Sequence, residues 1–193
     1  MLEWLLALDR EVLLLVNRSL ANPVFDALLP WFREKLFWAP LYIFLLAFIF
    51  EHFGKKAWWL VLGLVITVGL ADFFSSELVK KNVRRLRPCN DITLAAELQP
   101  RVRCGSGYSF TSSHATNHFA VAVYLSFFLG RLHRRVRPAL LLWAASIAYA
   151  QVYVGVHYPG DVLVGGLLGA WIGWIVARRV ARLMGFNAAR AVV

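Results

Sequence analysis

The chain has 193 residues, of which 60% are hydrophobic and 17% are charged, whereas soluble globular domains are nearer half apolar and a quarter charged. This composition excludes an ordinary soluble domain and predicts one membrane-embedded domain over residues 1–193. The formal net charge of +10 suits anionic lipid headgroups or an anionic substrate, and it argues against nucleic acid because the basic residues alternate with apolar segments.

The N-terminal region, residues 1–33, predicts an amphipathic helix that lies in the membrane interface. Apolar residues recur on one side of it at helical spacing, with charged residues between them. They are Leu5, Leu6, Val12, Leu13 and Val16. No cleavable signal peptide is expected, because Glu3 and Asp9 come early and no basic stretch precedes the apolar run. A sixth span formed by this region is the alternative.

Five apolar segments follow, at 36–50, 57–74, 115–130, 139–156 and 162–177. Several are shorter than the ~20 residues needed to cross the hydrocarbon core, and aromatic residues at their ends extend them into the interface. The predicted fold class is therefore all-α. It is a polytopic transmembrane helical bundle of five to six spans, with its helical core at residues 36–180.

Basic residues predict the orientation of the bundle. Lys and Arg gather at 55–56, 131–138 and 178–182. Five crossings place these regions on one side, which the positive-inside rule makes cytoplasmic. The loop 80–113 and the turn 157–161 then lie on the extracytoplasmic side. The loop is itself basic, so its charges need another role.

The last apolar segment carries Gly165, Gly166, Gly169 and Gly173 at near-helical spacing. Small residues allow helices to pack closely. This packing is expected either within the bundle or between protomers, and we prefer the first.

The two cysteines of the chain, Cys89 and Cys104, both lie in the loop 80–113. Their position predicts a disulfide across an exposed loop in an oxidising compartment. Two free thiols are the alternative.

Three polar clusters fall at span ends on the predicted extracytoplasmic face, at 80–88 (KKNVRRLRP), 108–118 (YSFTSSHATNH) and 157–161 (HYPGD). Ionisable groups are costly to desolvate in a membrane, and they usually mark a functional site there. Because a helical bundle brings distant segments together at one end, we expect the three clusters to converge.

Two of these clusters are suited to bind an anion. Lys80 and Arg87 offer fixed positive charge to phosphate oxygens. Ser112 and Ser113 stand where a helix should begin, and hydroxyls and free amides at a helix N-terminus form an anion site.

The histidines supply the remaining chemistry. His114 and His157 can act as general acid and nucleophile near neutral pH. Asp161 can hydrogen-bond an imidazole and fix its tautomer, although an aspartate here also suits a simple helix cap. Together with the cationic groups, these residues indicate phosphoryl transfer without a metal.

The motifs also resemble a known family. Lys80 followed after six residues by Arg87 and Pro88, then TSSHA at 111–115, then VYVGVHYPGD at 152–161, is similar to the three signature motifs of the type-2 phosphatidic acid phosphatase superfamily. These proteins are integral membrane lipid phosphate phosphatases. The resemblance covers roughly residues 36–180.

The resemblance implies a role for each motif residue. His157 would attack phosphorus and carry a phosphohistidine, with Asp161 orienting it. His114 would protonate the leaving alkoxide and then activate water. The phosphoryl oxygens would be held by Lys80, Arg87, Ser112 and the backbone amide of Ser113. No metal or other cofactor would be needed, and a metal site on His114, His118, His157 and Asp161 is disfavoured because no further ligand lies nearby in the sequence.

Two positions depart from the family pattern. The second motif usually reads Pro-Ser-Gly-His, whereas this chain has Thr-Ser-Ser-His at 111–114. In the third motif Gln151 stands where an arginine is usual, so it can donate hydrogen bonds to phosphate but brings no charge. Four arginines of the loop can compensate, namely Arg84, Arg85, Arg101 and Arg103. An inactive relative is the alternative.

We therefore expect a phosphatase whose partners are the phospholipid bilayer and a membrane lipid substrate, in the bacterial inner membrane with its site on the extracytoplasmic face. Candidate substrates are undecaprenyl diphosphate, phosphatidylglycerophosphate, phosphatidic acid and phosphorylated lipid A. A lipid phosphotransferase and a non-catalytic transporter or scaffold for anionic lipids are the alternative functions.

Overall fold

The computed structural model describes residues 2–185, and every regular element in this range is helical. The longer helices are α1 (Leu2–Leu14), α2 (Pro23–Phe32), α3 (Ala39–Phe53), α4 (Ala57–Asp72), α6 (Ser113–Leu129), α7 (Val136–Tyr153) and α8 (Pro159–Leu183). Shorter helical stretches join or extend them: η1 (Leu15–Ser19), η2 (Lys35–Trp38), η3 (Gly54–Lys56), η4 (Phe73–Val79), α5 (Lys80–Val83) and η5 (Pro88–Asn90). The predicted all-α class is confirmed.

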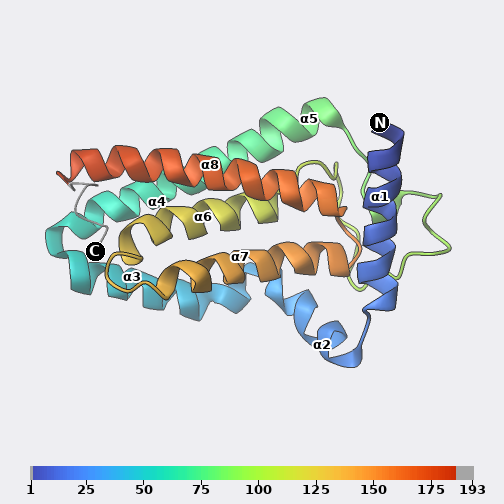
Figure 1. Cartoon of the computed structure of the whole chain (residues 1–193), viewed down its shortest axis with the longest axis horizontal. Helices are drawn as coiled ribbons and strands as arrows, with labels where there is room; N and C mark the ends of the chain where they lie inside the picture. Colours follow the sequence, from blue (N-terminus) through green and yellow to red (C-terminus); the bar gives the residue numbers. More distant parts are fainter. Residues whose placement is uncertain (1, 186–193) are drawn as a thin grey trace.

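Helices α3, α4, α6, α7 and α8 run side by side as an elongated bundle, with α1 lying across one end (Figure 1). These five helices coincide with the five apolar segments predicted from the sequence. The turns at 54–56 and 130–135 and the C-terminal end of α8 lie at the end away from α1. The predicted basic clusters therefore share one end of the bundle.

Helix α6 is central, and the glycines of α8 let the two helices touch backbone to backbone. A Cβ atom added to Gly169 would lie 2.0 Å from the carbonyl oxygen of Thr116, and one added to Gly173 would lie 2.3 Å from that of Ala120. Only hydrogen fits at such distances. The glycine stripe thus packs within the bundle, as preferred from the sequence.

Fewer helical stretches meet the length and hydropathy expected of a membrane span than the five apolar helices of the bundle would suggest. Two helical stretches are long and apolar enough to span a membrane, Lys35–Asn90 and Pro159–Leu183. A third arises if Glu3–Ser19 and Pro23–Phe32, which meet at a bend of 118°, count as one broken span. The five to six spans expected from the sequence stay a prediction.

The N-terminal region is helical as predicted and belongs to a second hydrophobic core at the end of the bundle. Leu13, Val16 and Leu29 are buried there against Leu94 and Leu98 of the long loop. Burial of about five such side chains stabilises this end by several kcal/mol. The N-terminal helices α1 and α2 and the loop therefore pack as one layer over the helix ends.

Polar contacts fasten the same layer. Asn17 is fully buried, and its amide nitrogen donates to the carbonyl oxygens of Gln99 at 2.9 Å and Tyr153 at 2.8 Å. A disulfide joins Cys89 to Cys104 within the loop. These links hold the loop against the ends of α7 and α8, where the three motifs meet.

Candidate active site

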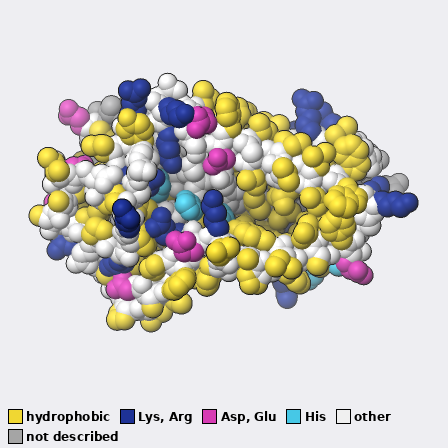
Figure 2. All heavy atoms as spheres, turned by 180° about the vertical axis from the view of Figure 1, so that it is seen from behind, with side chains coloured by type: hydrophobic (Ala, Val, Ile, Leu, Met, Phe, Trp, Pro, Cys, Tyr) yellow, Lys and Arg dark blue, Asp and Glu magenta, His cyan; other side chains and the backbone are white. Residues whose placement is uncertain are grey.

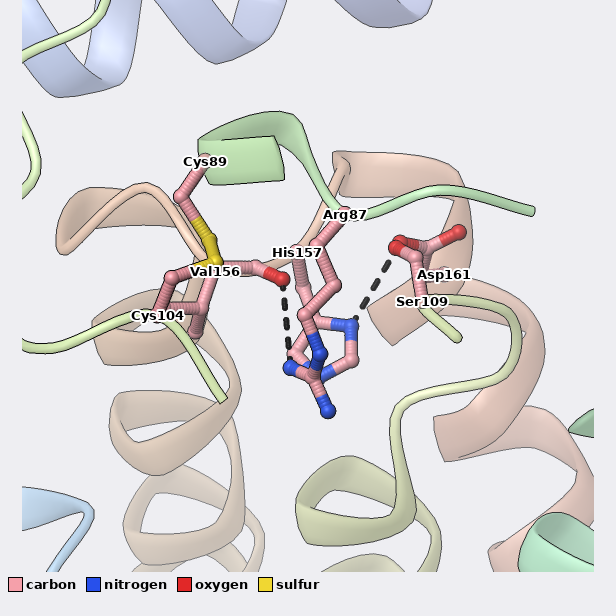
Figure 3. Close-up of a disulfide and its surroundings, with 7 residues drawn as sticks. All are labelled: Arg87, Cys89, Cys104, Ser109, Val156, His157 and Asp161. Carbon is pink, nitrogen blue, oxygen red and sulfur yellow. Dashed lines mark hydrogen bonds and ion pairs between the residues drawn. A yellow bond between two sulfur atoms is a disulfide. The ribbon is translucent and has the colours of Figure 1, made fainter. Parts of the chain in front are cut away.

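His157 occupies the turn between α7 and α8 and is 1% exposed. Its backbone amide and that of Val156 both donate to the carbonyl oxygen of Gln151, at 3.2 Å each. Gly155 adopts φ +81°, a left-handed conformation that L side chains rarely take. This tight turn aims the imidazole into the end of the bundle, beside Arg87 and Asp161 (Figure 3).

Asp161 lies in the first turn of α8 and is fully buried. Its Oδ2 atom accepts hydrogen bonds from the Ser109 hydroxyl and, at 2.9 Å, from the Tyr158 amide. The same oxygen lies 3.4 Å from Nδ1 of His157, a contact longer than an ordinary hydrogen bond that becomes an ion pair when the imidazole is protonated. Asp161 therefore caps the helix and also faces the imidazole, so the two roles expected from the sequence coexist.

The other imidazole nitrogen identifies the tautomer. Nε2 of His157 lies 3.2 Å from Nη1 of Arg87. A guanidinium has no acceptor, so Arg87 donates and Nε2 carries the lone pair. The proton of the neutral ring is then on Nδ1, the nitrogen that faces Asp161.

Burial sets the protonation state of this ring. Desolvation lowers the pKa of His157 to about 4, with Arg87 contributing in the same direction, while the contact with Asp161 opposes the shift. At neutral pH the imidazole is therefore neutral and its Nε2 lone pair is available as a nucleophile.

The first two motifs meet through a pair of polar contacts. Nζ of Lys80 donates to the hydroxyl oxygen of Ser113 at 2.9 Å, and the Ser76 and Ser113 hydroxyls are also 2.9 Å apart. Ser112 is the N-cap of α6, its hydroxyl accepting from the Ala115 amide at 3.4 Å. The predicted cationic group thus stands at the N-terminus of α6, where free amides favour an anion.

His114 lies one residue further into α6, within electrostatic range of His157 and Lys80. Its ring is parallel to that of His118, with 6.3 Å between centroids. Both nitrogens of His118 already have contacts, Nδ1 with the His114 carbonyl oxygen at 2.8 Å and Nε2 with the Tyr42 hydroxyl at 3.4 Å. Between residues 2 and 185, no three His, Cys, Asp or Glu side chains form a group that could hold a metal ion.

The three motifs therefore converge as predicted, and Figure 2 shows histidine surface in a hollow flanked by Lys and Arg side chains. The phosphate-binding role expected of Gln151 stays a prediction. Its side chain is fully buried, and neither of its polar atoms has a hydrogen-bond partner in the described part of the chain.

The arginines expected to compensate for Gln151 are engaged elsewhere or exposed. Arg85 bridges Asp9 and Asp161, and Arg101 pairs with Asp26 while its guanidinium lies over the ring of Tyr153. The other two, Arg84 and Arg103, are exposed on the surface of the loop.

Arg33 is a basic residue of the site that sequence reasoning missed. It caps the C-terminus of α2 and is half-buried, within electrostatic range of both Arg87 and His114. Its Nε atom is buried and has no hydrogen-bond partner among residues 2–185. No motif marks this position, so only the fold could reveal it.

Asp9 was also missed, although the sequence holds a signal for it. The residue lies on the same face of α1 as Leu5, Val12 and Leu13, so it is a carboxylate within an apolar stripe. Such a placement requires a partner, and the structure supplies Arg85.

Known proteins are similar to this chain in sequence. A family model described as the PAP2 superfamily matches residues 56–184. A lipid A 4'-phosphatase of Bacteroides thetaiotaomicron is 33% identical over 178 residues, which cover 91% of this chain and 78% of the relative. An undecaprenyl-diphosphatase of Sulfolobus acidocaldarius is 32% identical over 144 residues, which cover 75% and 64% of the two chains.

Solved structures agree in fold. The crystal structure of Aquifex aeolicus LpxE superposes with a TM-score of 0.67 at 26% identity, covering 89% of this chain and 95% of that chain. A transmembrane PAP2 type phosphatidylglycerolphosphate phosphatase from Bacillus subtilis gives a TM-score of 0.74 at 22% identity, covering 95% and 89%.

Proposed function

This chain belongs to the PAP2 superfamily of membrane lipid phosphatases, and we propose that it removes a phosphate group from a lipid through a phosphohistidine on His157. The chain is an integral membrane protein and a phosphatase by its relatives. The observation that carries the proposal is the pairing of His157, whose Nε2 lone pair is directed at Arg87 while its Nδ1 faces Asp161.

The first step is a displacement at phosphorus. Nε2 of His157 forms a bond to phosphorus while the bond from phosphorus to the lipid oxygen breaks. Burial lowers the pKa of His114 to about 3 in the free protein, so His114 would take up its proton together with the anionic substrate phosphate. It gives that proton to the lipid oxygen, which leaves as an alcohol, or as a phosphate if the substrate is a diphosphate. The imidazole gains positive charge in this step, and the buried carboxylate of Asp161 stabilises it.

The second step reverses the roles. His114, now neutral, takes a proton from water as the water oxygen attacks phosphorus. The bond between phosphorus and Nε2 breaks, inorganic phosphate leaves, and His157 is again neutral. A lipid or sugar hydroxyl in place of water would make the same centre a phosphotransferase.

Fixed cations would hold the phosphoryl oxygens. Arg87 donates to Nε2 of His157 in the free protein, and a phosphate oxygen can take over that hydrogen bond. Lys80 reaches the N-terminus of α6 through Ser113, where the amide of Ser113 and the hydroxyl of Ser112 are the predicted contacts. Arg33 would supply the charge that Gln151 lacks, since it lies near Arg87 and His114.

The substrate we favour is a phosphorylated lipid A. The relatives of Bacteroides thetaiotaomicron and Porphyromonas gingivalis, both lipid A 4'-phosphatases, match 91% of this chain. Undecaprenyl diphosphate is the second candidate, by similarity to the Sulfolobus acidocaldarius enzyme.

The proposed location is the inner membrane, with the site facing outward. The disulfide between Cys89 and Cys104 supports this face, because disulfides persist in oxidising compartments. Arg87 is two residues from Cys89, so the same bond holds a phosphate-binding group beside His157 (Figure 3).

The test is phosphate release by the purified protein in detergent, with EDTA present throughout. Lipid A, undecaprenyl diphosphate, phosphatidylglycerophosphate and phosphatidic acid are compared. His157→Ala should abolish release, whereas His52→Ala, which changes an exposed histidine near the far end of α3, should not. Release that needs an added divalent metal would contradict the metal-free mechanism.

The same experiment separates the alternative functions. A phosphotransferase yields a new phosphorylated lipid or sugar and little free phosphate. A transporter or scaffold releases none, and its function survives His157→Ala.

A further inference from the structure

Helix α1 reaches the catalytic end through one carboxylate. Oδ2 of Asp9 lies 2.7 Å from Nη2 of Arg85, and Oδ1 of Asp9 accepts from the amide of Gly160 at 2.6 Å. Gly160 is the residue before Asp161. Both partners of the ion pair are shielded, with side chains 12% (Asp9) and 20% (Arg85) exposed.

Arg85 continues this connection inward. Its Nη1 atom donates to Oδ1 of Asp161 at 2.9 Å, and its guanidinium lies 3.7 Å from the ring centroid of Tyr158. Asp161 in turn contacts His157. One planar guanidinium thus bridges a carboxylate of α1 and the carboxylate that faces the imidazole.

We propose that Asp9 is a positioning residue of the catalytic centre, which holds Arg85 and the turn before Asp161 so that Asp161 can orient and charge-stabilise His157. The proposal rests on the proposed function. It makes α1, which lies outside the family match at residues 56–184, a part of the active site.

Charge balance gives the physical reason. Arg85 paired with Asp161 alone would be a neutral unit, and a buried carboxylate that is fully neutralised stabilises a cationic imidazole weakly. Asp9 shares the guanidinium, so these three groups together carry one net negative charge, which opposes the positive charges of Arg87 and Lys80 that also act on His157. That charge favours the positively charged ring formed during the reaction.

Geometry gives a second reason. Asp9 touches the backbone of the YPGD turn as well as Arg85. Removing its carboxylate releases two groups that hold Asp161, namely the backbone at Gly160 and the guanidinium of Arg85. Displacements of this kind, far from the reacting bond, can lower rates by one to two powers of ten.

The experiment compares Asp9→Asn and Asp9→Glu with Glu11→Gln, which makes the same carboxylate-to-amide change on an exposed position of α1. Arg10→Gln is a second control, because it breaks the ion pair of α1 with Glu97 without touching Arg85. Steady-state phosphate release gives kcat and KM for each variant. Nitrogen NMR of the His157 ring, assigned with His157→Gln, follows its titration without needing turnover.

Asp9→Asn should lower kcat about tenfold with little change in KM, and it should move the His157 titration downward by about one pH unit. The downward sign follows because a nearby negative charge is lost, while the other charged groups that act on the ring, Arg87, Lys80 and Asp161, are unchanged. Asp9→Glu keeps the carboxylate, so its kcat and its His157 titration should lie close to those of the unmodified protein. The two controls should match the unmodified protein in both measurements.

An unmoved titration in Asp9→Asn would overturn the proposal, whether or not the protein is less stable, because a merely structural contact lowers the unfolding temperature alone. The two proposals fail differently. If the unmodified protein releases phosphate from no lipid, the proposed function is wrong, and the titration still decides whether Asp9 acts on His157.

Discussion

The middle of the bundle and its catalytic end are held by opposite kinds of contact. Between α6 and α8 the chain uses the absence of side chains, with Gly169 and Gly173 against backbone carbonyl oxygens. At the catalytic end it uses charge, with Asp161 buried among Arg85, Ser109 and the Tyr158 amide. The first region tolerates no added atom, whereas the second tolerates no lost partner.

Addition of one methyl group to the middle region should give the largest effect. Gly169→Ala places a Cβ 2.0 Å from the Thr116 oxygen, so α8 must move off α6, and we expect destabilisation by more than about 3 kcal/mol. Thermal unfolding in detergent measures it. Gly69→Ala is the matched control, since a Cβ there meets nothing within 4 Å. Equal unfolding temperatures for the two variants would mean that α6 and α8 do not touch through this seam.

A change of pH tests the charged end. Burial lowers the pKa of His157 to about 4 from 6.5, so between these values the unfolded chain binds a proton that the folded chain does not. The free energy of unfolding is therefore unaffected by this group above pH 6.5. It decreases as the pH falls from 6.5 toward 4, by about 3 kcal/mol in all. The free energy of unfolding between pH 4 and 7 measures it.

His157→Gln supplies the control for that measurement, because it keeps a polar side chain but cannot titrate. The difference in unfolding free energy between the two proteins should shrink as the pH falls. A difference that does not vary with pH would show that His157 titrates normally.

Removal of one cation should give the smallest effect. Arg33→Gln is expected to raise KM for the lipid about tenfold, or about 1.4 kcal/mol, because one partly exposed charge near the proposed phosphate-binding residue Arg87 is lost. Arg103→Gln removes the same charge from an exposed position of the loop 80–113 and should leave KM unchanged. If both variants behave alike, Arg33 acts only through the general positive field and not at the site.

The positions of the helices and the meeting of the three motifs could be predicted from the sequence, because apolar runs and motif spacing are local signals. Apolar runs of near-span length became α3, α4, α6, α7 and α8. The motif residues met at one end because each lies next to a helix terminus, and antiparallel neighbours place those termini together.

Partner choice among the charged residues was less predictable. From the sequence, Arg85 and Arg101 were equally good substitutes for the arginine that Gln151 replaces. In the structure each forms an ion pair with a carboxylate of the N-terminal region, Arg85 with Asp9 and Arg101 with Asp26. An ion pair between residues 9 and 85 leaves no periodic trace in a sequence, because its spacing is set by how two separate helices dock.

Hydropathy and motif spacing were thus sufficient to indicate an all-helical membrane protein and to predict a histidine-based phosphoryl-transfer centre, since both signals depend on neighbours along the chain. That Arg33 lies near Arg87, and that Asp9 of α1 pairs with Arg85, depended on the folded chain. Only the folded chain brings two distant charges close together and excludes water around them, and both effects strengthen their pairing.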